Sequence, residues 1–202
     1  MYLNNLAQSV FLRLNRRKSG NRSAFVRFWR DDLPLELFRA RWAMLISLLV
    51  FVISMIIGAY STEVYPDFTR VILGDDYVAM TEFNIESGDP MAVYKHTRQD
   101  TMFLQITINN IRVALLAFVM GFLLSIGTIH ILVNNGIMVG TFLYFFYQKG
   151  LLYTSMLTIW IHGAFEISSI VVAGGAGIVL GAGIIFPGTY ASGQPLFRSA
   201  KR

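Results

Sequence analysis

The sequence contains no cysteine and few charged residues. Charged side chains make up 14% of the 202 residues and hydrophobic ones 54%, whereas a soluble domain is roughly a quarter charged. The lack of cysteine excludes a disulfide framework and a thiolate metal site. The shortage of charge excludes an ordinary soluble enzyme, and the high hydrophobicity excludes a disordered chain. The composition therefore favours a membrane protein.

The charges that are present are unevenly distributed. Residues 1–41 carry nine basic and three acidic side chains, whereas residues 61–107 carry three basic and eight acidic ones. Glu166 is the lone acid among the last 102 residues. A net charge of +5 raises the question of nucleic-acid binding. Because the asymmetry is typical of a membrane protein, we expect the lipid bilayer, and no nucleic acid, as a partner.

Long runs without charge predict the membrane spans. The run Trp42–Tyr60 would extend about 28 Å as a helix, which matches the hydrocarbon core of a bilayer. A second run covers Ile111–Val133. Residues 136–186 contain only Lys149 and Glu166 as charged residues and are long enough for two spans. We therefore expect an all-α fold, a polytopic transmembrane helical bundle with about four spans and a partly helical extracytoplasmic loop.

The runs divide the chain into five segments. These are a cytoplasmic basic amphipathic arm (1–33), an interfacial helix continuing into the first span (34–60), an extracytoplasmic acidic loop (61–107), a membrane bundle (108–186) and a cytoplasmic basic tail (187–202). Within the bundle, spans are expected near 108–133, 136–159 and 162–186. The turns between them are expected at Asn134–Gly136 and at 160–162.

A second division of the bundle is open. It breaks the chain at Gln148–Gly150, just after the aromatic cluster Tyr144–Tyr147, which resembles an interfacial belt. The segment before this break would then be about 12 residues, which favours a re-entrant element over a full span.

Basic residues predict the orientation of the chain. Nine basic side chains precede the first span, and Arg198, Lys201 and Arg202 follow the last one. Because basic residues concentrate in cytoplasmic loops, both termini of the multi-pass protein are expected in the cytoplasm. The apolar positions Leu3 and Leu6 recur with helical spacing through residues 2–18. This pattern indicates either a helix on anionic lipid or part of a cytosolic helical subdomain.

Polar residues within the predicted spans form the candidate site. Glu166 follows His162 by four residues, so both side chains share a helix face. The expected topology brings them to the same depth as Asn109, Asn110 and Arg112. Since ionisable residues within a membrane are costly and usually functional, we predict that these five side chains converge. Glu166 is expected to pair with Arg112.

Three interpretations of this cluster compete. It is a polar clamp that locks two helices together, or a site for a lipid headgroup, peptide or ion, or a metal site. A metal site lacks support because His162 and Glu166 supply only two ligands, and a catalytic zinc needs a third. We therefore expect no metal, no other cofactor and no catalytic residue. The loop acids Asp75, Asp76, Glu82, Glu86 and Asp89 are expected to form a solvated face.

Small residues predict where helices pack. They recur at a four-residue spacing at Gly136 and Gly140, and again at Ala173, Gly177 and Gly181. Small residues let helix backbones approach closely where lipid offers no hydrophobic driving force. The stripe either closes the bundle internally or forms a homo-oligomer.

Three stretches carry a family resemblance: ITINNIRVALLAFVMGFLLSIGT, NNGIMVGTFLYFF and IWIHGAFEISSIVVAGGAGIVLGAGIIFPG. They resemble the membrane region of the stage II sporulation protein M family. FVRFWRDDLPLELFRARW and ILGDDYVAM upstream are similar to its Bacteroidota members, so the resemblance covers about residues 22–190. The family's characteristic positions correspond to Asn109, Asn110, Arg112, Asn135, Gly136, His162, Gly163, Glu166, Ala173, Gly174 and Gly177.

The resemblance implies a multi-span bacterial inner-membrane protein with no established enzymatic activity. In spore formers the family is associated with peptidoglycan-degrading enzymes during engulfment, where it acts as a membrane scaffold. Long members carry a further cytosolic region before the segment matching Tyr2 and a further span after the segment matching Arg202. The resemblance therefore implies one of three cases: a short member of the family, a misassigned start, or the ordered part of a larger protein that extends at both ends.

Two functions follow as hypotheses. The first is a non-enzymatic scaffold that anchors membrane or envelope protein partners through its acidic loop and basic arm. The alternative is a transporter or lipid-handling protein that uses the Arg112, His162 and Glu166 cluster as a substrate site; an intramembrane hydrolase ranks third. A cavity reaching Glu166 would favour transport, whereas a tightly packed and fully paired cluster would favour the scaffold.

Overall fold

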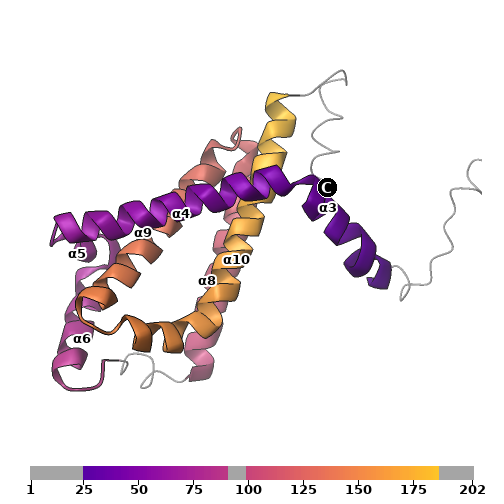
Figure 1. Ribbon diagram of the computed structural model, residues 1–202. Helices are drawn as coiled ribbons and strands as arrows, with labels where there is room; N and C mark the ends of the chain where they lie inside the picture. The colour runs from indigo at the N-terminus through magenta and orange to yellow at the C-terminus, as the bar shows by residue number, and fades with distance from the viewer. Residues whose placement is uncertain (1–24, 91–98, 187–202) are drawn as a thin grey trace, which may run out of the picture. The chain divides into compact units, whose positions relative to one another are not determined.

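The computed structural model describes residues 25–90 and 99–186, without the side chains of 99–103 and 158–162. Every regular element in these ranges is a helix (Figure 1). The all-α fold class predicted from sequence is therefore confirmed. The tail 187–202 and most of the arm 1–33 lie outside the described residues.

The chain forms two compact units, Met1–Arg39 and Ala40–Arg202. In the first unit a π-helical turn, η1 (Phe28–Asp32), is followed directly by α3 (Leu33–Arg39). No residue of either element is buried, and Trp29 packs edge-on against the ring of Phe28.

The first span is a helix of its own. The prediction of one helix over 34–60 is wrong, because α3 ends at Arg39 and α4 (Arg41–Val64) begins after a turn at Ala40. The dihedral angles of Ala40 are φ −86° and ψ 6°. A ψ near zero interrupts the helical hydrogen-bond series, since helical residues have ψ near −42°.

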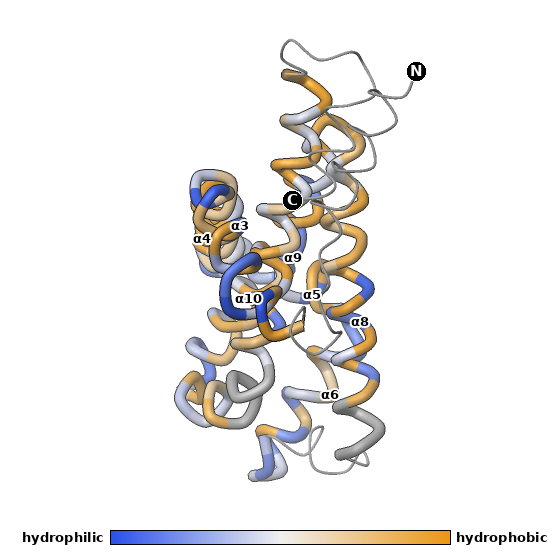
Figure 2. Tube along the Cα trace, turned by 90° about the vertical axis from the view of Figure 1, so that its right-hand side faces the viewer, coloured by the Kyte–Doolittle hydropathy of each residue, from blue (hydrophilic) through white to orange (hydrophobic). Residues whose placement is uncertain are grey.

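The described residues of the second unit contain four helices that are long and apolar enough to cross a membrane, which confirms the predicted number. After α4, its elements are α5 (Phe68–Leu73), α6 (Asp75–Glu86), α8 (Gln99–Val119), η2 (Met120–Phe122), α9 (Ile126–Gln148) and α10 (Leu152–Ile185). The four candidate spans are Arg41–Val64, Leu104–Phe122, Ile126–Gln148 and Gly163–Ile185. Hydrophobic residues occupy most of the length of these helices (Figure 2).

The predicted turn at Asn134–Gly136 is wrong, because α9 continues through it. Asn135 donates from Nδ2 to the carbonyl oxygen of Ile131, four residues earlier, at 2.8 Å. This bond satisfies the amide within a helix, where an asparagine pair otherwise favours a turn. The chain instead turns at Leu124 and Ser125, whose φ angles are 53° and 65°.

The turn predicted at 160–162 is also wrong, because α10 runs through these residues. The break lies at Lys149–Leu151, near the position of the second division, and Gly150 supplies a φ of 70° that favours glycine. The helix before the break is not a short re-entrant element. It begins at Ile126 and has 23 residues, about 35 Å in length.

Hydroxyl and small residues lie inside the bundle, and large apolar residues lie outside. On α4, Ser47 and Ser54 are buried, whereas Ile53, Ile56 and Ile57 are exposed. Ser47 donates a hydrogen bond of 2.7 Å to the carbonyl oxygen of Val171 on α10. This distribution is typical of helices that pack together in lipid.

The α5–α6 hairpin folds back onto the ends of the spans. Val78 on α6 is only 2% exposed and packs with Phe145 and Phe146 of α9. Gly74 joins the two short helices with a φ of 90°. The partly helical loop predicted from sequence is thus present. We call the end of the unit formed by α5, α6 and the helix ends next to them the α5–α6 end.

Candidate functional site

A cavity of about 370 Å³ lies among α8, α9 and α10, and residues of α4, α5 and α6 complete its wall. Most of its wall is apolar, including Phe51 and Ile170. Its polar lining comes from Tyr77, Asn109, Asn110, Asn135, Ser155 and Glu166. An apolar cavity with a few polar groups is the usual form of a small-molecule site.

Three residues of the predicted cluster line this cavity. Asn109 and Asn110 reach it from α8, and Glu166 reaches it from α10. Glu166 is half-buried and has an interaction within the protein. The side chain of His162 lies outside the described residues.

Arg112 does not take part in the predicted pair. Its side chain is exposed and forms no ion pair with Glu166 in the described part of the chain. Residues four before it and three after it, Ile108 and Leu115, are exposed apolar residues. Since these spacings share one helix face, Arg112 lies on the outward face of α8.

Asn135 lines the cavity, although the sequence pattern does not predict it there. The dipeptide Asn134–Asn135 before a glycine predicts a turn, so neither side chain was expected within the bundle. The signal that could have identified it is the polarity of Asn135 halfway along a 23-residue apolar helix. Ser155 and Tyr77 carry no comparable signal, because serine and tyrosine are common in spans and at their ends.

The predicted packing residues lie at close helix contacts within this chain. A Cβ on Gly136 would lie 2.7 Å from the carbonyl oxygen of Phe51, and one on Gly140 would overlap the carbonyl oxygen of Met55. Gly177 faces Ala117 and Thr128, Gly181 faces Ser125, and Ala173 is half-buried. These glycines bring α4 against α9 and bring α10 against the ends of α8 and α9.

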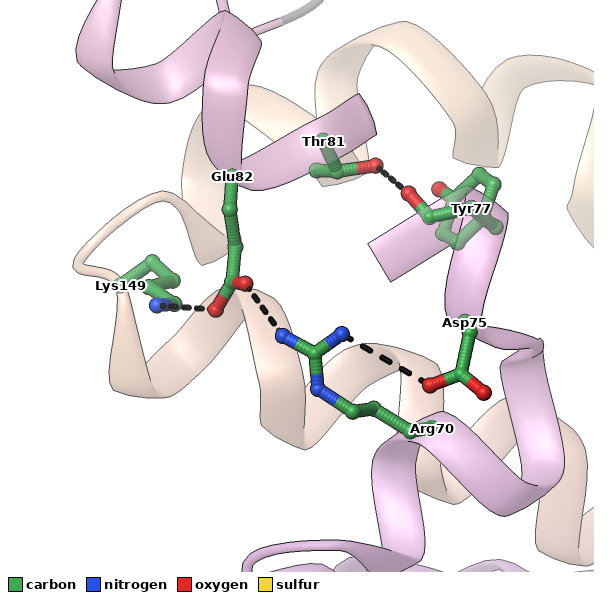
Figure 3. A network of polar contacts seen from close by, with 6 residues as sticks. All are labelled: Arg70, Asp75, Tyr77, Thr81, Glu82 and Lys149. Atoms are coloured by element: carbon green, nitrogen blue, oxygen red, sulfur yellow. Dashed lines mark hydrogen bonds and ion pairs between the residues drawn. The ribbon is translucent and has the colours of Figure 1, made fainter. Parts of the chain in front are cut away.

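An ionic network fastens α5 and α6 to the turn after α9 (Figure 3). Glu82 accepts a hydrogen bond from Arg70 at 2.8 Å and another from Lys149 at 3.0 Å. Arg70 also pairs with Asp75 at 3.7 Å. Glu82 is therefore held between two cations, and it is not part of a purely solvated acidic face.

Two further hydrogen bonds lie at the α5–α6 end. The Tyr144 hydroxyl donates to Glu63 at 2.6 Å, and Gln148 donates to the same carboxylate oxygen at 3.3 Å. Both contacts connect α9 with the end of α4. Because Leu73 and Tyr77 belong to the cavity wall, the contacts at the α5–α6 end also hold part of that wall in place.

The model of a known family matches residues 47–202, and its description is stage II sporulation protein M. The chain belongs to this family. No curated protein and no solved structure matches it significantly. With four apolar helices, this member of the stage II sporulation protein M family is a multi-pass membrane protein.

Five of the eleven positions that carry the resemblance to the stage II sporulation protein M family line the cavity. Asn109, Asn110, Asn135, Gly163 and Glu166 all line it, although they come from three different helices. A helical bundle brings distant sequence positions together only through its packing. The cavity thus brings four polar residues and one glycine of the resemblance together, whereas Arg112 lies on the outward face of α8.

We expect Glu82→Gln to loosen the α5–α6 hairpin without unfolding the bundle. The change removes a charge held by Arg70 and Lys149, whose side chains are 40% and 37% exposed. Partly exposed ion pairs are worth at most about 1 kcal/mol, which corresponds to roughly fivefold faster amide exchange in α6. Hydrogen exchange read by mass spectrometry measures this change. Glu86→Gln, at an exposed position of the same helix, is the control, and equal rates in both variants would contradict the network's role.

Proposed function

We propose that this protein binds a small molecule in the cavity beside Glu166 and acts as a transporter or a lipid-handling protein. The observation that carries the proposal is the cavity itself. Its volume of about 370 Å³ falls within the ~300–1,000 Å³ of small-molecule sites. Its apolar wall with one carboxylate and several amides suits a ligand that has an apolar part and a polar group.

A purely structural clamp accounts less well for this arrangement. Helices that only hold each other fill the space between them, as α4 and α9 do at Gly136 and Gly140. Polar side chains inside a membrane are costly unless they are paired or have a function. Here several polar side chains line a cavity, whereas α4 and α9 next to it pack in backbone contact. This difference supports a binding role.

We propose a bacterial inner-membrane location, which membership of the family supports, and a cytoplasmic N-terminus, which the basic residues before α4 support. The α5–α6 end then faces away from the cytoplasm, and the cavity is closer to that side. No chemical step is part of the proposal, since transport and lipid handling require only binding and release.

Gly163 offers a direct test, because it lines the cavity and, apart from its chain neighbours and its own helix backbone, no atom of the described residues lies within 4 Å of a Cβ added to it. We expect Gly163→Phe to fill the cavity while the helix persists, since phenylalanine favours a helix more than glycine does. Native mass spectrometry of protein extracted from native membranes should show a bound small molecule on the wild type and a loss of at least tenfold in its occupancy on the variant.

The matched control is Leu115→Phe, which adds an aromatic ring on the outward face of α8, where Leu115 is 59% exposed. The control should retain the bound molecule. Equal occupancy in Gly163→Phe and the wild type would contradict the proposal, as would the absence of any bound molecule in the wild type.

A scaffold role is the second candidate, favoured by exposed apolar residues on the α5–α6 hairpin. Phe83 is 68% exposed, and Val71 and Met80 are also exposed, although none of them belongs to a candidate span. Such residues outside a membrane suit a protein partner. A photo-reactive residue at position 83 should then crosslink to one protein, and one at position 115 should not. Lipid adducts alone at both positions would contradict the scaffold.

A further inference from the structure

Arg112 is an exposed cation within a candidate membrane span. It forms no ion pair with any residue that the structure describes. It lies eight residues, or about 12 Å along the helix, from the beginning of the span Leu104–Phe122. Its neighbours on the outward face, Ile108 and Leu115, are apolar and 63% and 59% exposed. Because a charge at this depth is costly, an anionic group is needed to compensate it.

Two further polar residues connect Arg112 with the beginning of the span. Gln105 and Asn109 are both exposed, and they precede Arg112 by seven and three residues. Residues at these spacings share one helix face, so the three form what we call the α8 polar stripe. Side chains on a helix lean toward its N-terminus, so the long side chain of Arg112 extends toward the nearer membrane surface. The stripe therefore leads from that surface to the guanidinium group.

We propose that the α8 polar stripe binds the headgroup of an anionic phospholipid, with the lipid phosphate at Arg112. A guanidinium group donates two parallel hydrogen bonds to a phosphate. The amides of Gln105 and Asn109 donate and accept hydrogen bonds, which suits a hydroxylated headgroup such as glycerol. The exposed apolar residues beside the stripe suit the acyl chains. Residues 104–122 contain no acid, so the span has no carboxylate to bind the amine of a zwitterionic headgroup.

A second protein chain suits the stripe less well than a lipid does. Two copies of this chain that met at α8 about a twofold axis would bring like charges together at Arg112. The acids in the candidate spans are Glu63, which accepts hydrogen bonds from α9, and Glu166, which lines the cavity. A different partner helix with a carboxylate would compensate the arginine but would give Gln105 and Asn109 no role. A headgroup that enters from the membrane surface contacts all three residues of the stripe.

The lack of cysteine in the chain allows a local test. Ile108→Cys places a fluorophore beside the stripe, and Ile53→Cys, at a 54% exposed position of α4 within an uncharged run, is the control. The labelled full chain enters vesicles of equimolar phosphatidylcholine and phosphatidylglycerol, in which one lipid or the other carries brominated chains. Quenching then measures which lipid contacts the label. We expect about fivefold enrichment of phosphatidylglycerol at position 108, the attraction of one arginine for anionic lipid, and none at position 53.

Variants of Arg112 test whether its charge selects the lipid. Arg112→Gln should lower the enrichment at position 108 to the value at position 53. Arg112→Lys keeps the charge without the two parallel donors and should retain part of the enrichment. Enrichment that persists in Arg112→Gln would overturn the proposal. Equal contact of both lipids with position 108 in the chain that retains Arg112 would also overturn it, and that result does not depend on the folding of any arginine variant.

Two further outcomes separate this site from the cavity and from a protein interface. The site lies on the outward face of α8 and shares only Asn109 with the cavity wall, so Gly163→Phe should leave the enrichment unchanged. Its loss in Gly163→Phe would place the lipid in the cavity and overturn the surface site. A photo-reactive residue at position 108 should give lipid adducts in native membranes. Crosslinking to one protein would overturn the lipid as the occupant.

Discussion

Gly140→Leu is expected to prevent the bundle from closing. A Cβ at this position would overlap the backbone carbonyl oxygen of Met55 on α4, and backbone cannot rotate away as a flexible side chain does. Since α4 and α9 are in contact at this glycine, the two helices must separate. We expect a loss of about 3 kcal/mol or more in the free energy of unfolding, at the upper end of overpacking effects. Reversible unfolding in a detergent mixture measures it.

Gly163→Leu is the matched control for this change. It makes the same substitution on α10, at a glycine whose added Cβ meets no atom of the described residues within 4 Å, apart from its chain neighbours and its own helix backbone. Its stability should be unchanged or rise by up to about 1 kcal/mol, because leucine favours a helix more than glycine does. Equal losses in the two variants would show that the backbone contact of Gly140 is not responsible.

Glu166→Gln is expected to weaken ligand binding without affecting assembly. The change keeps the shape of the side chain and removes its charge, so the wall around the cavity is preserved. A hydrogen bond to a charged group contributes about 1.5–3 kcal/mol, which corresponds to roughly 10-fold to 100-fold in affinity. Occupancy of the native ligand at graded concentrations, read by native mass spectrometry, measures the effect.

The control for the charge is Glu86→Gln, at an exposed position on α6 away from the cavity wall. It should bind as the wild type does. A Glu166→Gln variant that fails to fold, with a normal control, would favour the polar clamp over the binding site. A variant that folds and binds normally would also contradict the account.

The number of spans could be predicted from sequence because it depends on one physical quantity, the length of uncharged runs relative to bilayer thickness. The boundaries of the spans depend on competition between residues that favour a turn and residues that favour a helix. Asn135 belongs to a dipeptide that favours turns, yet its amide bonds to the carbonyl of Ile131 and the helix continues. Leu124 and Ser125 form the turn in a left-handed conformation that neither residue type indicates.

The candidate site could be predicted in part for a related reason. Asn109, Asn110 and Glu166 stand out as polar residues in apolar helices, and the structure places them around one cavity. Arg112 carries the same signal, but its position around α8 places it on the outward face with Ile108 and Leu115. The cavity depends on how six helices pack, which the spacing of residues along one helix does not reveal.

The most direct test of the central claim, that the cavity admits a ligand, uses the lack of cysteine in the chain. Asn109→Cys places one thiol on the cavity wall, and Leu115→Cys places one on the outward face of the same helix. A membrane-impermeant cationic thiol reagent should modify the first at least tenfold faster in native membranes. Adding Gly163→Phe should abolish the difference. Equally slow modification of both thiols, or no effect of Gly163→Phe, would contradict the account.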